Sequence, residues 1–468
     1  MVNKAIRVFW CGWSCALLAL GQIQHNAGAA HQQLMDWLAA YDGKDWNAYL
    51  EFLRNNFVTK PEPMLQYAPF RDETGGFTLK KIGTESAFAT TALIEERNTD
   101  QTARVVLEVE MAEPHRIVKL HAEPIAPSHL SETELLDRTR KLLQKLTAED
   151  RFSGVVLIAK DGKSIFEQAY GLANREHDIS NTMHTRFGMA SMDKMFTAVG
   201  ILQLVKARKL KLDDPIGLYL NDYSNQELAS KVTIRQLLNH TGGTGDFFGP
   251  EFDNHRRELQ THEDYIHLFG SRPPRFEPGS RFEYSNYGFV ILGALIDKVS
   301  GQNYYDYVRD HVYIPAQMSS TALPAPGGQP VANLSLGYTK RGGGTWHTFQ
   351  DLPASRGTAA GGGYITAGDL LNFANALQRH ELLDADSANL LTTAHTSTSI
   401  GGRYGYGFEV SSVNGLECFG HGGLGPGTDD DLKICPAAGY VLVVLANLDP
   451  PNGQRVASYI VNRLPESR

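Results

Sequence analysis

The spacing of apolar side chains changes along the chain, and each change predicts a different element. Between residues 31 and 57, apolar side chains recur every three or four positions, as they do on one face of a helix. From Phe77 to Lys119, short runs rich in β-branched residues lie between turn residues and predict a meander of strands. Helices followed by strands are typical of a small α+β domain. We expect this domain over residues 30–127.

The pattern of residues 30–127 resembles the cone-shaped fold of nuclear-transport-factor-like proteins.

A second pattern starts near residue 128 and runs to residue 468. Residues 130–146 have the leucine spacing of an amphipathic helix, and Asp161-Gly162 is a signal for a two-residue hairpin. Five strands are expected, over residues 154–159, 164–170, 417–420, 432–435 and 440–448. Strands at both ends with helices between them predict an α+β domain, in which one antiparallel sheet is flanked by helices and an all-helical lobe.

The first 29 residues have the features of a signal peptide. Lys4 and Arg7 form a positive start, residues 8–21 are mostly apolar, and Ala27-Gly28-Ala29 is a small-residue cleavage motif. The alternative is a membrane anchor, but the apolar run is shorter than the roughly 18 residues of a spanning helix. We therefore expect export to the periplasm or the medium of a bacterium, and no stable membrane span after cleavage.

Composition and charge narrow the range of partners. The chain of 468 residues is 42% hydrophobic and 21% charged, which is ordinary for a soluble globular protein. Cleavage after Ala29 removes two basic residues and no acidic residue, so the net charge of −8 becomes −10. This balance argues against nucleic acid or an anionic membrane surface as a partner.

The cysteines and acidic clusters suggest no metal site. Cys11 and Cys15 leave with the signal peptide, whereas Cys418 and Cys435 lie in predicted strands and could form a disulfide after export, or two small buried thiols. No His/Cys cluster has metal-ligand spacing. Asp429-Asp430-Asp431 is expected to be a solvated hairpin turn, with a metal site as the alternative.

Ser191-Met192-Asp193-Lys194 is the first segment that carries candidate chemistry. Ser191 opens an apolar run, so it is expected at the first turn of a buried helix. Lys194, three residues later, would lie on the same face and could reach the serine oxygen. A serine hydroxyl is a weak nucleophile until a base takes its proton, and burial or a neighbouring cation could prepare a lysine for that task. Taken alone, a serine at this position is more often a helix N-cap.

Two further segments complete the candidate site. Tyr284-Ser285-Asn286 lies between a turn-rich stretch and an apolar helix. The phenol of Tyr284 could act as acid or base if nearby cations lowered its pKa. The amide of Asn286 could hold a substrate carbonyl. His421-Gly422-Gly423 ends a predicted strand, where the glycines could let substrate lie against the backbone. The backbone N–H groups of Leu424 and Ser191 could together stabilise an oxyanion. The alternative for the tyrosine segment is a buried tyrosine hydrogen bond followed by an asparagine cap. The alternative for the histidine segment is a simple glycine-rich turn.

Together these motifs resemble those of the class C β-lactamase-like serine hydrolase family, which has the penicillin-binding-protein fold and includes D-Ala carboxypeptidases, D-aminopeptidases and esterases. The resemblance covers residues 150–462, about two-thirds of the chain. It is supported by Leu-Leu-Asn-His-Thr-Gly-Gly at 237–243, which is similar to the family's Leu-Leu-x-His-Thr-Ser-Gly, and by the segments 282–288 and 359–370.

The resemblance implies a role for each motif. Ser191 would be the acylated nucleophile, Lys194 its activating partner and Tyr284 the general base. Asn286, His421, Gly422 and Gly423 would position substrate, and the backbone groups of Ser191 and Leu424 would form the oxyanion hole.

One departure from the family bears on the substrate. Class C β-lactamases have Lys-Thr-Gly where this chain has His-Gly-Gly, which favours the esterase and peptidase branches. A small-acyl esterase without a cofactor is therefore our first expectation, followed by a D-amino-acid peptidase or carboxypeptidase and then a β-lactamase. The substrate would be a small molecule or a short peptide. The rival hypotheses are a ligand-binding protein that kept the fold, and a function dominated by the N-terminal domain, which could bind a partner or form an oligomer.

Overall fold

The computed structural model describes residues 28–43, 45–59, 71, 73–323, 331–340, 344–349, 357–398 and 401–466. These residues form two compact units, one ending at Ile125 and the other starting at Ala126. Most of the expected signal peptide, residues 1–27, lies outside the described residues, so its cleavage stays a prediction. No helix among the described residues is long and apolar enough to cross a membrane.

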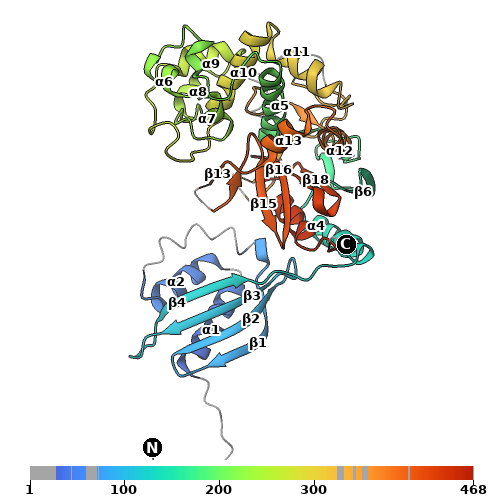
Figure 1. Ribbon diagram of the computed structural model, residues 1–468. Coiled ribbons are helices and arrows are strands. Elements are labelled where there is room, and N and C mark those ends of the chain that lie inside the picture. Colours follow the sequence, from blue (N-terminus) through green and yellow to red (C-terminus); the bar gives the residue numbers. More distant parts are fainter. Residues whose placement is uncertain are drawn as a thin grey trace, which may run out of the picture. The chain divides into compact units, whose positions relative to one another are not determined.

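In the described part of the first unit, two helices pack on one face of a four-stranded antiparallel meander (Figure 1), and residues 71, 73 and 74 are also helical. Its elements are α1 (Ala29–Asp42), α2 (Trp46–Asn56), β1 (Phe77–Glu85), β2 (Ala89–Glu96), β3 (Thr102–Val109) and β4 (Ile117–Pro124). Every second residue of β2 is buried, because alternate side chains of a strand point to one face. Ile94 and Val105 meet Leu34 and Trp37 of α1 in the core of this unit. The order of helices and strands agrees with the sequence pattern, whereas the likeness to a nuclear-transport-factor-like cone stays a prediction.

The second unit is built on an eight-stranded antiparallel sheet, in the order β13-β14-β15-β16-β17-β18-β5-β6. The two ends of the unit meet where β18 pairs with β5, with Leu442 opposite Ile158. This pairing confirms the antiparallel sheet predicted from strands at both ends. The strands are β5 (Gly154–Lys160), β6 (Lys163–Tyr170), β13 (Thr396–Ser397), β14 (Arg403–Tyr404), β15 (Glu409–Val413), β16 (Leu416–Gly425), β17 (Thr428–Cys435) and β18 (Tyr440–Ala446).

Both faces of this sheet are covered, and β18 shows why its sequence is apolar throughout. Val441, Val443 and Leu445 point into the larger core, which they share with α5 (Asp193–Lys206), α10 (Asn286–Ser300) and α12 (Ala367–Gln378). Leu442 and Val444 point into a second core, with α4 (Glu132–Ala148) and α14 (Asn452–Val461). A strand that is buried on both faces has no polar side to alternate with.

A helical lobe forms around α10 (Figure 1). Its other helices, and those near it, are α6 (Gln226–Lys231), α7 (Ile234–Leu238), α8 (Pro250–His255), α9 (His262–Phe269), α11 (Tyr304–Val308) and α13 (Ala385–Thr392). Shorter helical turns are η2 (Ala190–Met192), η3 (Ile216–Leu218), η4 (Arg309–Tyr313) and η5 (Pro436–Ala438), and minor strands are β7 (Leu172–Asn174), β8 (Ile179–Ser180), β9 (Phe187–Gly188), β10 (Tyr338–Thr339), β11 (His347–Thr348) and β12 (Tyr364–Ile365).

The three consecutive aspartates do not form a solvated turn, so that prediction is wrong. Asp429, Asp430 and Asp431 lie within β17 and are buried. Each has a local reason to be there: Asp429 accepts backbone N–H groups at the start of α14, Asp430 accepts the N–H of Ala446, and Asp431 pairs with Lys433. The chain turns before them, between Gly425 and Thr428.

The two remaining cysteines lie on neighbouring strands. Cys418 of β16 and Cys435 of β17 form a disulfide with an S–S distance of 2.01 Å. Both are buried in the core beneath α4 and α14. The bond links the strand that carries His421 to the strand that carries the aspartates.

Candidate active site

Ser191 lies in a helical turn, η2, directly before α5 rather than on the first turn of that helix. Ala190, the residue before it, has a φ of 40°, which is disfavoured for a residue with a Cβ and marks a locally constrained turn. The carbonyl of Ala190 accepts a hydrogen bond from the N–H of Gly362 at 3.2 Å. The glycine-rich segment around Gly361 and Gly362 therefore supports the backbone that presents Ser191.

Lys194 is completely buried and holds three polar partners. Its Nζ lies 3.2 Å from Ser191 Oγ and 2.7 Å from Asn286 Oδ1, and it also bonds to the carbonyl of Ala360. It lies 4.9 Å from the centre of the Tyr284 ring. Burial lowers the pKa of Lys194 to about 7, although Asp246 and Asp193 act in the opposite direction. A large share of Lys194 is therefore neutral near pH 7 and can accept a proton.

Asp193 is a buried acid beside this lysine that sequence reasoning did not single out. It accepts hydrogen bonds from the phenols of Tyr313, at 3.2 Å, and Tyr304, at 3.4 Å. Burial raises the pKa of Asp193. The signal was present in the sequence, since an acidic residue within a helix that is apolar all round must find buried partners.

Tyr284 and Asn286 approach Lys194 from the start of α10. Ser285 caps that helix by accepting the N–H of Gly288 at 2.8 Å, which places its two neighbours at the site. Asn286 bridges Lys194 and Asp246, whose Oδ2 lies 2.8 Å from Asn286 Nδ2. The phenol of Tyr284 bonds to the Ser191 side chain. Burial raises the pKa of Tyr284, and Glu409 and Asp246 act in the same direction, so the condition that nearby cations lower this pKa is not met.

His240 supports Tyr284 from behind. Its ring centre lies 4.3 Å from that of Tyr284 and 4.7 Å from that of Tyr404. Its Nδ1 accepts the N–H of Ser285 at 3.1 Å, which means that Nδ1 carries no proton. Burial holds the pKa of His240 far below its usual value. This neutral ring therefore holds the entry to α10 in place.

His421 lies on β16 with both ring nitrogens already engaged. The phenol of Tyr404 donates to Nε2 at 3.0 Å, and Nδ1 donates to the carbonyl of Gly422 at 2.6 Å. Burial lowers the pKa of His421 to about 4, so the ring is neutral at pH 7. A direct bond from this ring to a substrate carboxylate would have to replace one of these partners. The sequence indicated nothing of Tyr404, because it comes from a separate strand.

Of the two glycines after His421, Gly423 allows close packing of the Ser191 segment, whereas Gly422 lies against Gln454 and Asp430. A Cβ on Gly423 would lie 2.7 Å from the carbonyl oxygen of Met189. That space is therefore filled by the segment before Ser191, whereas the sequence suggested that substrate would use it. Leu424, the next residue, is 48% exposed at the end of β16. Its backbone role in an oxyanion hole stays a prediction.

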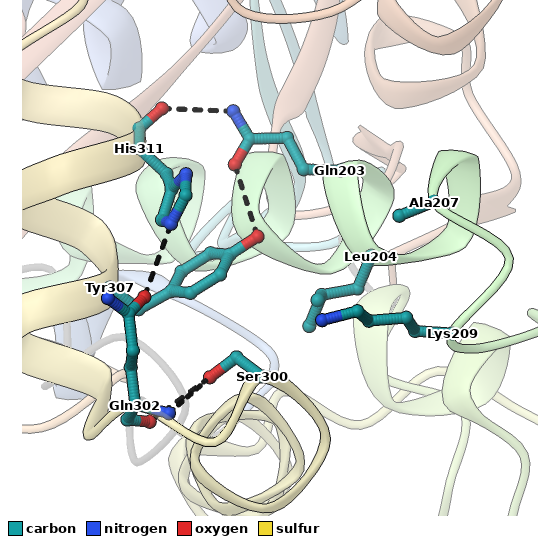
Figure 2. Close-up of a pocket in the computed structure, with 8 residues that line it drawn as sticks. All are labelled: Gln203, Leu204, Ala207, Lys209, Ser300, Gln302, Tyr307 and His311. Carbon is teal, nitrogen blue, oxygen red and sulfur yellow. Dashed lines mark hydrogen bonds between the residues drawn. The ribbon is translucent and has the colours of Figure 1, made fainter.

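A surface hollow of about 410 Å³ lies elsewhere on α5 (Figure 2). It is lined by Gln203, Leu204, Ala207, Lys209, Ser300, Gln302, Tyr307 and His311. Gln203 lies about 15 Å along the helix from Asp193, at about 1.5 Å per residue, so this hollow is separate from the Ser191 site. Within the described parts of the chain, no group of three or more His, Cys, Asp or Glu side chains could hold a metal ion.

Comparison with known proteins places the second unit in a family. Residues 139–464 match the family described as Beta-lactamase. Penicillin-binding protein 4* of Bacillus subtilis (strain 168) is 31% identical over 187 residues, which span 39% of this chain and 40% of that relative. The structure of a penicillin-binding protein from Bacillus halodurans is 35% identical, with a TM-score of 0.61 over 68% of this chain and 98% of its own.

An amidohydrolase has a similar structure. The D-stereospecific amidohydrolase from Streptomyces sp. is 28% identical and covers 68% of this chain and 96% of its own, with a TM-score of 0.59. The family match spans more than half of the chain and includes the segments of Ser191, Lys194, Tyr284 and His421. The chain therefore belongs to the Beta-lactamase family and is a serine hydrolase with the penicillin-binding-protein fold.

Proposed function

We propose that the protein hydrolyses ester or amide bonds through an acyl-enzyme on Ser191. The observation that carries this proposal is the environment of Lys194, which is buried against Ser191 Oγ at 3.2 Å and has its pKa lowered to about 7. The carbonyl of Ala360 and Oδ1 of Asn286 can only accept hydrogen bonds. They take two N–H groups of a neutral amine, and its lone pair is left for the proton of Ser191.

Acylation then follows a balanced path of protons. Ser191 Oγ attacks the carbonyl carbon while its proton passes to Lys194 Nζ. When the tetrahedral intermediate collapses, the leaving group takes a proton from the Tyr284 phenol, and Lys194 returns one to Tyr284. The raised pKa of Tyr284 supports this donor role, because a neutral phenol has a proton to give. In deacylation, water attacks the acyl carbonyl while its proton passes to Lys194 Nζ; Tyr284 then gives a proton to Ser191 Oγ as the intermediate collapses, and Lys194 returns one to Tyr284.

The charge of the site favours substrates whose leaving group has no carboxylate. His421 is neutral and has both ring nitrogens occupied, and it stands where class C β-lactamases have a lysine. Esters of small acyl groups are therefore our first substrate class. Amides and peptides of D-amino acids are second, supported by the likeness to the D-stereospecific amidohydrolase. β-Lactams are third.

A substrate panel tests this function. Purified protein would be given p-nitrophenyl acetate, a D-alanine amide, a D-Ala-D-Ala peptide and a chromogenic cephalosporin. We expect steady-state turnover of the ester at the highest kcat/KM, and its loss in Ser191→Ala. Ser280→Ala changes an exposed serine on a turn and serves as the matched control, with unchanged turnover.

Two outcomes would contradict the proposal. Turnover that survives in Ser191→Ala would remove Ser191 as the nucleophile. A complete lack of turnover on all four substrates, combined with reversible binding of any of them, would favour a ligand-binding protein that kept the fold.

Location and assembly are further parts of the proposal. Export to the periplasm or the medium rests on the features of residues 1–29. Association through the first unit, residues 30–127, would be visible as a change in size when that unit is deleted.

A further inference from the structure

The orientation of the Asn286 side chain is fixed from its far side. Asn286 Nδ2 lies 2.8 Å from Oδ2 of Asp246, and Asn286 Oδ1 lies 2.7 Å from Lys194 Nζ. A carboxylate only accepts hydrogen bonds, so it must face the NH2 end of the amide. The oxygen end then points at Lys194.

Asp246 lies in the loop between α7 and α8 and is held by hydrogen bonds at both its side chain and its backbone. Its other oxygen, Oδ1, accepts the N–H of Phe247 at 2.7 Å, and Arg272 donates to its backbone carbonyl at 3.0 Å. The carbonyl of Gly245 accepts a hydrogen bond from the Ser285 hydroxyl. Both the carboxylate and the loop that carries it are therefore tied to the start of α10.

This arrangement decides what the lone pair of Lys194 faces. With the Asn286 oxygen toward it, the neutral amine donates to Asn286 and to Ala360, and its lone pair faces Ser191. If the amide turned over, its NH2 group would become a donor and would compete with Ser191 for that lone pair.

We propose that Asp246 is a positioning residue for the reaction: it holds the oxygen of Asn286 toward Lys194 and so keeps the lone pair of that lysine directed at Ser191. The inference rests on the proposed function of Ser191 and Lys194. The sequence left Asp246 without a role, since it lies 52 residues from Lys194 and 40 from Asn286. It also affects the protonation of Lys194, because its negative charge favours the ammonium form.

Other charged and titratable groups around Lys194 must be considered in any test of pH dependence. They are Asp193 on α5, Tyr284 before α10, His240 after α7, and His421 on β16. Asp193 acts on Lys194 in the same direction as Asp246, whereas Lys194 lowers the pKa of both histidines. A substitution of Asp246 also acts on one of these groups, because burial and then the charges of Glu409 and Asp246 raise the pKa of Tyr284.

Asp246→Asn is the test, because the two oxygens of Asp246 accept from two different N–H groups. An amide can present either its oxygen or its NH2 group to Asn286, so the variant no longer determines which end of the Asn286 amide faces Lys194. The second-order rate of labelling by a fluorophosphonate probe would be measured from pH 5 to 9. We expect it to fall about 10- to 100-fold at pH 8, the size of a small misplacement of a catalytic group.

The pH profile separates this role from a merely structural one. The acid limb is the range of pH in which the labelling rate rises as Lys194 loses its proton. Loss of the Asp246 charge should move this limb about one unit to lower pH, because that charge stabilises the ammonium form of Lys194. Asp246→Glu keeps the charge but displaces it, so its rate should fall while the acid limb stays in place. Asp253→Asn on α8 removes an exposed charge and should match wild type in rate and profile.

An Asp246→Asn profile that overlays wild type in rate and midpoint would overturn the inference. So would a slow variant with an unmoved acid limb and a lowered melting temperature, since that combination indicates damage to the loop alone. The proposed function fails separately, if Ser191→Ala still reacts with the probe.

Discussion

Burial has the largest effect on the chemistry of Lys194. Two carboxylates, Asp246 and Asp193, favour its ammonium form, yet desolvation prevails and the pKa falls to about 7. A surface lysine with the same neighbours would stay protonated at neutral pH. The apolar environment of the first turn of α5 is therefore as important to the proposed base as its distance from Ser191.

This balance predicts the pH dependence of turnover. The value of kcat/KM for p-nitrophenyl acetate should rise as the pH increases through about 7, because Lys194 must lose its proton to accept that of Ser191. The free energy of unfolding should also rise with pH between about pH 7 and 10. In that range Lys194 is protonated in the unfolded chain and neutral in the folded protein. A stopped assay from pH 5 to 9 measures the first effect. An acid limb with a midpoint near pH 4 would indicate a carboxylate base instead.

Lys194→Met should lower kcat/KM by about 10²- to 10⁴-fold, the usual contribution of a general base. Methionine fills much of the same space and leaves no buried charge behind. Lys206→Met is the matched control, since Lys206 lies at the other end of α5 and pairs with the exposed Asp384. Equal rates for Lys194→Met and wild type would contradict the role of Lys194, provided that both melt at similar temperatures.

Strand β17 illustrates how an element can override the usual meaning of its residues. Three consecutive aspartates are typical of a solvated turn, yet here they lie in the middle of a sheet that is covered on both faces. Burial raises the pKa of all three. The N-terminus of α14 and the last residue of β18 supply the backbone donors that make this placement possible.

Asp430→Asn should therefore flatten the pH dependence of stability. The folded protein keeps a proton on Asp430, whereas the unfolded chain loses it above about pH 4. Between about pH 4 and the folded pKa, such a carboxyl lowers the free energy of unfolding by about 1.4 kcal/mol per pH unit. Asparagine can still accept the N–H of Ala446. Urea unfolding at pH 5 and pH 8 measures the difference, with Asp253→Asn as the exposed control. An unchanged slope for Asp430→Asn would show that Asp430 is ionised in the folded protein.

The elements of the site were predictable where the chemistry follows the local sequence. The spacing of Ser191 and Lys194, and the apolar runs after Ser191 and Asn286, indicated two buried helices that begin at one site, and the structure has them. Partners that come from distant loops and strands, such as Asp246 and Tyr404, had no local signal. The burial of Asp430 was also hidden, because it depends on which elements cover β17.

At the scale of the whole molecule, the two compact units have separate cores. All the residues proposed for catalysis lie in the second unit, which starts at Ala126. The match to the Beta-lactamase family, residues 139–464, lies entirely within this unit. The sequence predicted this division from the change in pattern near residue 128. It could not predict what the first unit does, because a pair of helices on a meander is an architecture that does not by itself specify a chemistry.

A protein limited to residues 126–468 should therefore keep its turnover of p-nitrophenyl acetate. We expect kcat/KM to stay close to that of the full chain, because no core residue of the second unit is lost. Assay and size-exclusion chromatography on both forms check this, and the second measurement also tests whether the first unit forms oligomers. A folded truncated form that loses more than about tenfold in kcat/KM would show that the first unit takes part in catalysis.

Labelling by a fluorophosphonate probe, followed by peptide mass spectrometry, shows whether Ser191 becomes covalently modified as the nucleophile. We expect one adduct per chain, located on Ser191, at a rate that rises through about pH 7, and no adduct in Ser191→Ala. An adduct on another residue, or equal labelling of wild type and Ser191→Ala, would contradict this expectation.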